Sequence, residues 1–145
     1  MNMNMSNGNL PTLFLRVGGA VLLVLGIVGY IGIFNNVSFF NLDAGENLAH
    51  SVLGIVALGF GFFGNQNINK WLVLIVGIVG LIVGVSGFFL ANGDFMGGHF
   101  AKPNFFGLAN LENPADNLLH IVVGIVALLS VFLNRPSMTP AVGGR

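Results

Sequence analysis

Cysteine is absent from this 145-residue chain, and charge is scarce, since Asp, Glu, Lys and Arg together make up only 7% of it. Without cysteine there can be no disulfide framework, thiolate metal site or cysteine nucleophile. A soluble domain carries roughly 25% charged residues, so this chain cannot cover a water-facing surface with charge. The five basic and five acidic residues cancel. No basic run points to nucleic acid.

Apolar residues make up 54% of the chain, and the mean hydropathy is +0.87. They gather in four runs of the length that crosses a bilayer, which takes about 20 apolar residues. We expect spans at about 13–34, 44–63, 71–90 and 115–133. The sequence therefore predicts an all-α, integral membrane four-helix bundle that forms a single transmembrane domain over 1–145. Residues 1–11 and 134–145 are expected to be disordered tails.

A twelve-residue stretch occurs twice, at 47–58 and 117–128, with nine of the twelve positions identical at an offset of 70. The glycine pattern of 25–29 in the first span similarly resembles that of 76–80 in the third. We interpret the chain as two tandem two-helix repeats of the same orientation, about 12–63 and about 70–133. The second and fourth helices are then expected to lie side by side, with their histidines turned toward a shared interior.

Basic residues predict the orientation in the membrane. An even number of spans places the flank of the first span, the second connection and the C-terminal tail on one side. Four of the five basic residues lie there: Arg16, Lys70, Arg135 and Arg145. The side that carries the excess of Lys and Arg is normally cytoplasmic. We therefore expect a multi-pass membrane protein with both termini in the cytoplasm.

The duplicated stretch contains the candidate site. Each copy places an Asn, a His and a Gly at i, i+3 and i+7 on one helix face: Asn47, His50 and Gly54, then Asn117, His120 and Gly124. Each histidine lies about 10 Å along the helix from its start at 1.5 Å per residue, and an ionisable residue at that depth is costly and often functional. Two imidazoles facing each other could hold a metal, a haem iron or a transferable proton. The alternative is that neutral His and Asn only hydrogen-bond between helices.

Two acids support this pattern. Glu46 and Asp116 precede the histidines by four residues, on the same helix face, and each also lies in the first turn of its predicted helix. We expect both acids to act as helix caps, Glu46 with Asp43 and Asp116 after Asn113. A metal would need a further ligand, for which His99 is a candidate. No Ser-His-Asp arrangement, phosphate loop or zincin motif is present, so we expect a non-enzymatic protein.

Phenylalanine is concentrated on the side opposite the termini. Nine of the fourteen Phe residues lie at or beyond the helix ends there: Phe34, Phe39, Phe40, Phe88, Phe89, Phe95, Phe100, Phe105 and Phe106. Exposed apolar surface of this kind marks a contact with lipid headgroups or a protein partner. We therefore expect an accessory or interaction subunit of the membrane, with the histidine site as the alternative. A homo-oligomer is compatible with the sequence, and no cofactor is the simpler expectation.

The paired elements ENLAHSVLGIVAL and ADNLLHIVVGIVALL resemble those of a family of small prokaryotic membrane proteins that is catalogued as a domain of unknown function. The resemblance covers about 13–133 and is most specific at the Asn, His and Gly positions given above. It implies a four-helix bundle in the plasma membrane of a bacterium or archaeon. It implies no activity.

Overall fold

The chain folds into four helices, α1 (Leu10–Tyr30), α2 (Ala44–Phe63), α3 (Gln66–Leu90) and α4 (Ala115–Phe132). The computed structural model describes residues 9–33, 43–90 and 114–134, and these ranges contain no strand. The all-α fold class is confirmed. All four helices are long and apolar enough to cross a membrane, with mean hydropathies from 1.3 to 2.7 over their most apolar windows. Their outer faces carry exposed Leu, Ile, Val and Phe side chains, as lipid-facing surfaces do.

Polar caps set where the helices begin. Asn9 caps α1 by accepting the Thr12 N–H at 3.3 Å, and a proline occupies the first turn. Leu10 and Pro11 therefore belong to α1, which corrects the predicted tail 1–11. Asn65 accepts the Ile68 N–H at 2.9 Å, so α3 begins at Gln66, about five residues before the predicted start.

The two helix starts in the repeated segments differ. At α2 the predicted capping box is present: Asp43 accepts the Glu46 N–H at 2.8 Å and Glu46 accepts the Asp43 N–H at 2.9 Å. At α4 the cap position is Pro114, with no side-chain cap hydrogen bond. Asn113, the predicted cap, lies outside the described residues. Capping thus accounts for Glu46, whereas the predicted cap formed by Asn113 and Asp116 stays a prediction, and Asp116 lies in the first turn of α4 as expected.

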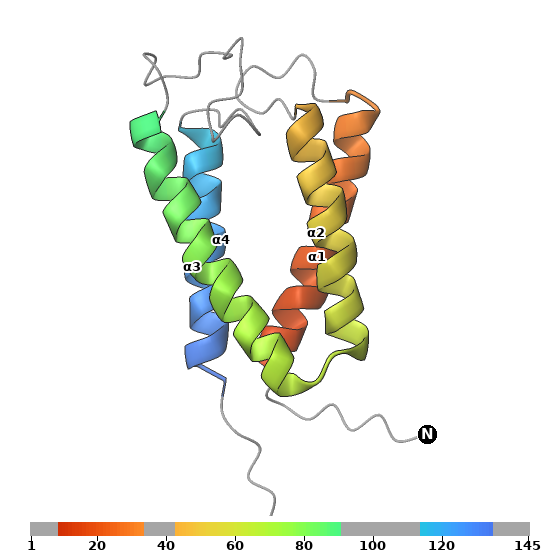
Figure 1. The fold of residues 1–145 in the computed structure, drawn as a ribbon, viewed down its shortest axis with the longest axis vertical. Coiled ribbons are helices and arrows are strands. Elements are labelled where there is room, and N and C mark those ends of the chain that lie inside the picture. Colours follow the sequence, from red (N-terminus) through yellow and green to blue (C-terminus); the bar gives the residue numbers. More distant parts are fainter. Residues whose placement is uncertain (1–8, 34–42, 91–113, 135–145) are drawn as a thin grey trace, which may run out of the picture.

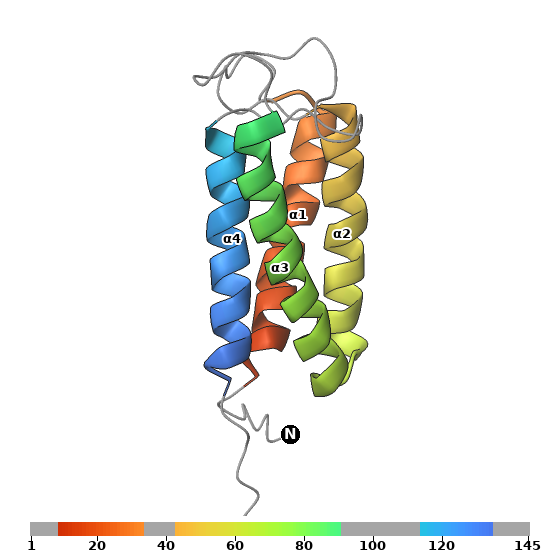
Figure 2. The same cartoon turned by 60° about the vertical axis from the view of Figure 1, so that its left-hand side comes forward.

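The helices pack as two pairs, α1 with α2 and α3 with α4 (Figures 1 and 2). We call the end of the bundle where α1 and α3 begin the turn end, and the end where α2 and α4 begin the loop end. The two pairs converge at the turn end and diverge toward the loop end (Figure 1). They meet mainly through α1, which contacts both α3 and α4.

The second and fourth helices are not side by side, contrary to the prediction. Within the described residues, no Cα atoms of α2 and α4 lie within 8 Å of each other. The reason is that each of these helices uses its glycine-bearing face to pack on the partner within its own pair. Instead, α1 and α3 are the two helices that contact each other diagonally across the bundle.

Glycines hold each pair together. A Cβ atom added to Gly54 on α2 would lie 2.6 Å from the Leu23 backbone nitrogen and 2.9 Å from the Gly19 carbonyl oxygen on α1. A Cβ atom added to Gly124 on α4 would meet the corresponding atoms of α3, the Leu81 nitrogen and the Gly77 oxygen, both at 2.9 Å. Without the glycines the backbones could not approach this closely, and in lipid such close packing drives helix association.

These contacts also fix how the first and third helices correspond. Gly19 corresponds to Gly77 and Leu23 to Leu81, an offset of 58. The sequence comparison of 25–29 with 76–80 uses an offset of 51 and is therefore wrong by seven residues. Seven residues are two helical turns, so glycines repeated at that spacing fall on the same face in either alignment. Only the packing partner distinguishes the two registers.

The apolar core lies in the half of the bundle nearer the turn end. It consists of Leu15 of α1, Val73 of α3, and Ala127 and Val131 of α4, all 5% exposed or less. Ala57 of α2 packs against it, so all four helices contribute. Beyond the core, at the turn end, the fully buried Asn69 of α3 donates a hydrogen bond to the Thr12 hydroxyl of α1 at 2.8 Å. This half of the bundle is where the two pairs are joined.

Candidate functional site

The two predicted asparagines lie between the helices of each pair and do not face the centre of the bundle. The side chain of Asn47 packs against Gly29 of α1, where a Cβ atom would overlap the amide, and Asn117 packs in the same way against Gly87 of α3. Asn117 is fully buried, and neither of its amide atoms has a hydrogen-bond partner among the described residues. Both asparagines therefore fill a notch left by a glycine. This corrects the prediction that they share a central site with the histidines.

The acids and histidines occupy a different flank of their helices. In α2, Glu46 and His50 are rotated by about 60–100° from Asn47, since each residue turns the helix by about 100°. Glu46 is 7% exposed and His50 is half-buried. In α4, Asp116 is 5% exposed and His120 is half-buried. The same flank is thus turned inward on both helices.

Electrostatic interactions link these side chains between α2 and α4, although no Cα atoms of the two helices lie within 8 Å of each other. Glu46 lies within electrostatic range of Asp116 on α4. His50 lies within electrostatic range of both His120 and Asp116. We call Glu46, His50, Asp116 and His120 the carboxyl–imidazole cluster. The two predicted histidines thus interact electrostatically, although their helices are not side by side as expected.

Hydrogen bonds orient one of the imidazoles. The Nδ1 atom of His120 lies 2.7 Å from the Asp116 carbonyl oxygen one turn earlier. Because a carbonyl oxygen only accepts, this nitrogen carries a proton and the Nε2 atom is left for the cluster. The Nδ1 atom of His50 is buried and has no hydrogen-bond partner among the described residues. A cluster of two carboxyls and two imidazoles can take up and release protons as one coupled unit.

A metal centre is not assembled by the described residues. No group of three His, Asp or Glu side chains among them is arranged to hold an ion, and structural or catalytic metal sites use at least three protein ligands. His99, the further ligand considered from the sequence, lies outside the described residues.

Glu46 and Asp116 belong to the cluster itself, whereas the sequence assigned them a supporting role as caps. The signal was present in the i, i+4 spacing of acid and histidine in both copies. Gly54 and Gly124, the other supporting residues, pack each pair at a level just beyond the histidines and so set the position of α2 and α4.

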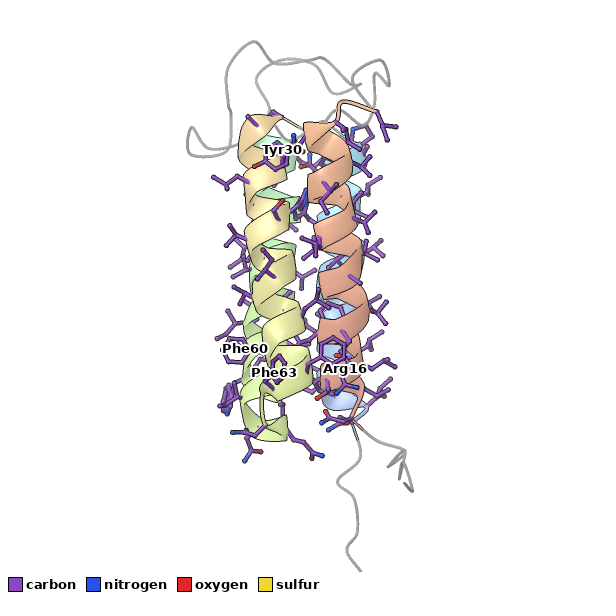
Figure 3. The ribbon with its side chains drawn as sticks, turned by 90° about the vertical axis from the view of Figure 1, so that its right-hand side faces the viewer. Arg16, Tyr30, Phe60 and Phe63 are labelled. Carbon is purple, nitrogen blue, oxygen red and sulfur yellow. The ribbon has the colours of Figure 1, made fainter. Side chains whose placement is uncertain are left out.

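At the turn end, Arg16 of α1 fastens the last turn of α2. Its Nε atom donates to the Gly61 carbonyl oxygen at 2.6 Å, and its guanidinium carbon lies 4.8 Å from the centre of the Phe62 ring. Figure 3 shows Arg16 beside the turn that carries Phe60 and Phe63, with Tyr30 at the opposite end of the bundle. The carbonyls at a helix C-terminus lack intrahelical donors and favour a cation. Arg16 is thus placed where its charge is tolerated, far from the cluster.

The fold defines a class, an all-α four-helix bundle in which all four helices are long and apolar enough to cross a membrane. No protein-family model matches the chain, and neither a curated protein nor a solved structure matches it. The resemblance to the four-span prokaryotic family therefore stays an expectation.

Proposed function

We propose that the carboxyl–imidazole cluster binds and releases protons, and that this is the working part of the protein. The observation that supports it is that an acid and a histidine on each of α2 and α4 are buried or half-buried and interact electrostatically between the two helices. Burying ionisable groups at this depth costs free energy, and packing does not require them, because the glycines and asparagines already hold each pair. Such groups in membrane helices typically serve proton or ion binding.

For the whole chain we propose a non-enzymatic role as a small accessory or interaction subunit of a membrane assembly. Large aromatic side chains at the helix ends support it: Phe63 is 91% exposed and Phe89 is 82% exposed. Exposed apolar surface at the ends of membrane helices favours contact with a partner or with headgroups. Most of the Phe-rich surface expected from the sequence lies outside the described residues.

The proposed location is the plasma membrane of a bacterium or archaeon, with both termini in the cytoplasm. The bias of Arg and Lys toward the turn end supports this orientation. Arg16 and Trp71 near the turn end and Tyr30 near the loop end fit interfacial anchors at both boundaries. The carboxyl–imidazole cluster would then lie in the half of the membrane away from the cytoplasm.

Infrared spectroscopy tests proton binding directly, since a protonated carboxyl group in an apolar site has a C=O stretching band that vanishes on ionisation. The purified protein is titrated in detergent from about pH 4 to about pH 10, a range that brackets the ordinary titration of carboxyls and imidazoles. We expect a titrating band that is absent in Glu46→Gln. Its midpoint should move down in Asp116→Asn, which removes a negative neighbour of Glu46.

Asp43→Asn is a second test of the same electrostatics, because Asp43 also lies within electrostatic range of Glu46. It should keep the band, since Glu46 remains, and move the midpoint in the same direction as Asp116→Asn. A band that persists unchanged in both Glu46→Gln and Asp116→Asn would refute the proposal.

Haem or metal binding is the alternative that the histidine pair keeps open. An ultraviolet–visible spectrum with metal analysis of the same preparation distinguishes it. A Soret band, or stoichiometric metal that is lost in the double variant His50→Ala and His120→Ala, would favour the alternative.

A further inference from the structure

The interior of the bundle is divided into two layers of opposite character. Toward the loop end the buried side chains are polar: Glu46, Asn47, Asp116 and Asn117. Toward the turn end they are apolar, and the core around Val73 and Ala127 takes residues from all four helices. Ala127 lies seven residues beyond His120, which is about 10 Å deeper at 1.5 Å per residue.

The apolar layer closes the interior below the cluster. Val73 and Ala127 are both 0% exposed, and Leu15 and Val131 are 3% and 5% exposed. The pair Asn69 and Thr12 at the turn end hydrogen-bond to each other. An apolar constriction repels water, and a proton needs water or a chain of titratable groups to cross it. Among the described residues no such chain leads from the cluster to the turn end.

No other charged group faces the cluster from the neighbouring helices. On α1 the ionisable residues are Arg16, which binds the end of α2, and Tyr30, which is 59% exposed at the loop end. On α3 the only ionisable residue is Lys70, in the first turns at the opposite end. Asp43, just before α2, lies within electrostatic range of Glu46. The two pairs of helices diverge toward the loop end (Figure 1), and the apolar layer lies on the other side of the cluster, toward the turn end.

We infer that the carboxyl–imidazole cluster exchanges protons with the water on one side of the membrane only, the side on which α2 and α4 begin, and that the protein does not conduct protons across. This inference rests on the proposed proton binding. It makes the cluster a one-sided acceptor, which reports the acidity of one compartment and leaves the gradient between compartments intact.

The lack of cysteine allows a direct test of access, because every introduced thiol is the only one in the chain. His50→Cys and His120→Cys are expressed in cells and treated with a charged, membrane-impermeant thiol reagent, once in sealed cells and once in inside-out vesicles. Ile31→Cys marks the loop end and Gln66→Cys marks the turn end, since both positions are exposed. Val73→Cys, in the apolar layer, is the buried control.

We expect both histidine positions to be labelled from the side that labels Ile31→Cys and not from the other, and Val73→Cys to be labelled from neither. Labelling of the histidine positions from the turn end, from both sides or from neither side would overturn the inference.

Proton flux provides a second measurement on the native chain, which does not depend on the folding of a variant. Vesicles with the purified protein, a trapped pH-sensitive dye and an imposed membrane potential should acidify no faster than vesicles without protein. Faster flux that is lost in Glu46→Gln would overturn the inference. If the infrared band fails to titrate while labelling is one-sided, proton binding is wrong and one-sided access stands. If the band titrates while labelling occurs from both sides, proton binding stands and one-sided access is wrong.

Discussion

Replacing Gly54 by alanine should destabilise the bundle by forcing α1 and α2 apart. The new Cβ atom would lie 2.6 Å from the Leu23 backbone nitrogen, whereas ordinary contacts begin at 3.4 Å. The Cβ atom is therefore 0.8 Å too close to a backbone atom. Because a backbone atom cannot rotate away as a side chain can, the two helices must separate. Overpacking of this kind costs about 1–3 kcal/mol. In Gly124→Ala the nearest atoms lie at 2.9 Å, a shortfall of 0.5 Å, and the loss should be smaller.

Gly59→Ala is the matched control, because it makes the same chemical change in the same helix. Its added Cβ atom would meet no atom within 4 Å, so stability should be unchanged or slightly raised. The assay is unfolding by sodium dodecyl sulfate in mixed micelles, followed by helical circular dichroism and by the fluorescence of Trp71, the sole tryptophan. The expected order of stability is Gly59→Ala, then Gly124→Ala, then Gly54→Ala. Equal midpoints for Gly54→Ala and Gly59→Ala would refute the glycine-packing argument.

Two further predictions concern the turn end. Arg16→Gln should lower stability by about 1–2 kcal/mol, because it removes a charged donor to the Gly61 carbonyl and the cation–π contact with Phe62; Arg16→Lys should lose less in the same unfolding assay, and equal losses would argue against a role for the charge. Asn69→Leu and Thr12→Val should each cost about 1–2 kcal/mol, since each strands or removes half of a buried hydrogen bond. A double-mutant cycle should show coupling of at least about 0.5 kcal/mol between them, and strictly additive losses would contradict the bond.

The sequence predicts the number of helices and most of their bounds, because span length and caps are local properties. The range 44–63 for α2 matches the structure, and its capping box was readable from Asp43 and Glu46. The start of α3 was missed because Gly64, Asn65 and Gln66 read as a turn, while Asn65 in fact caps the helix. A polar residue at a helix start and one in a turn look alike until the bonded N–H is known.

The arrangement of the helices was not predictable by the same means. A repeat shows that two helices are alike, and it does not show whether they touch. Asn47 and His50 lie close enough on the helix surface to be interpreted as one site. In the structure Asn47 packs against Gly29, whereas His50 interacts electrostatically with residues of α4. That separation depends on which neighbour offers a glycine notch. The alignment of the first and third helices failed for a related reason, because glycines two turns apart give equivalent faces.

The two helix pairs reach the same packing although their connections differ in length, with 13 residues between α1 and α2 and 24 between α3 and α4. Closing the longer loop costs only about 0.5 kcal/mol more, since the entropy grows with the logarithm of length. The close packing of the helix backbones therefore sets the register within each pair, and the length of the connecting segment does not. The segment after α3 is consequently where evolution, or an engineer, can lengthen, shorten or replace sequence while the scaffold beneath it keeps its shape.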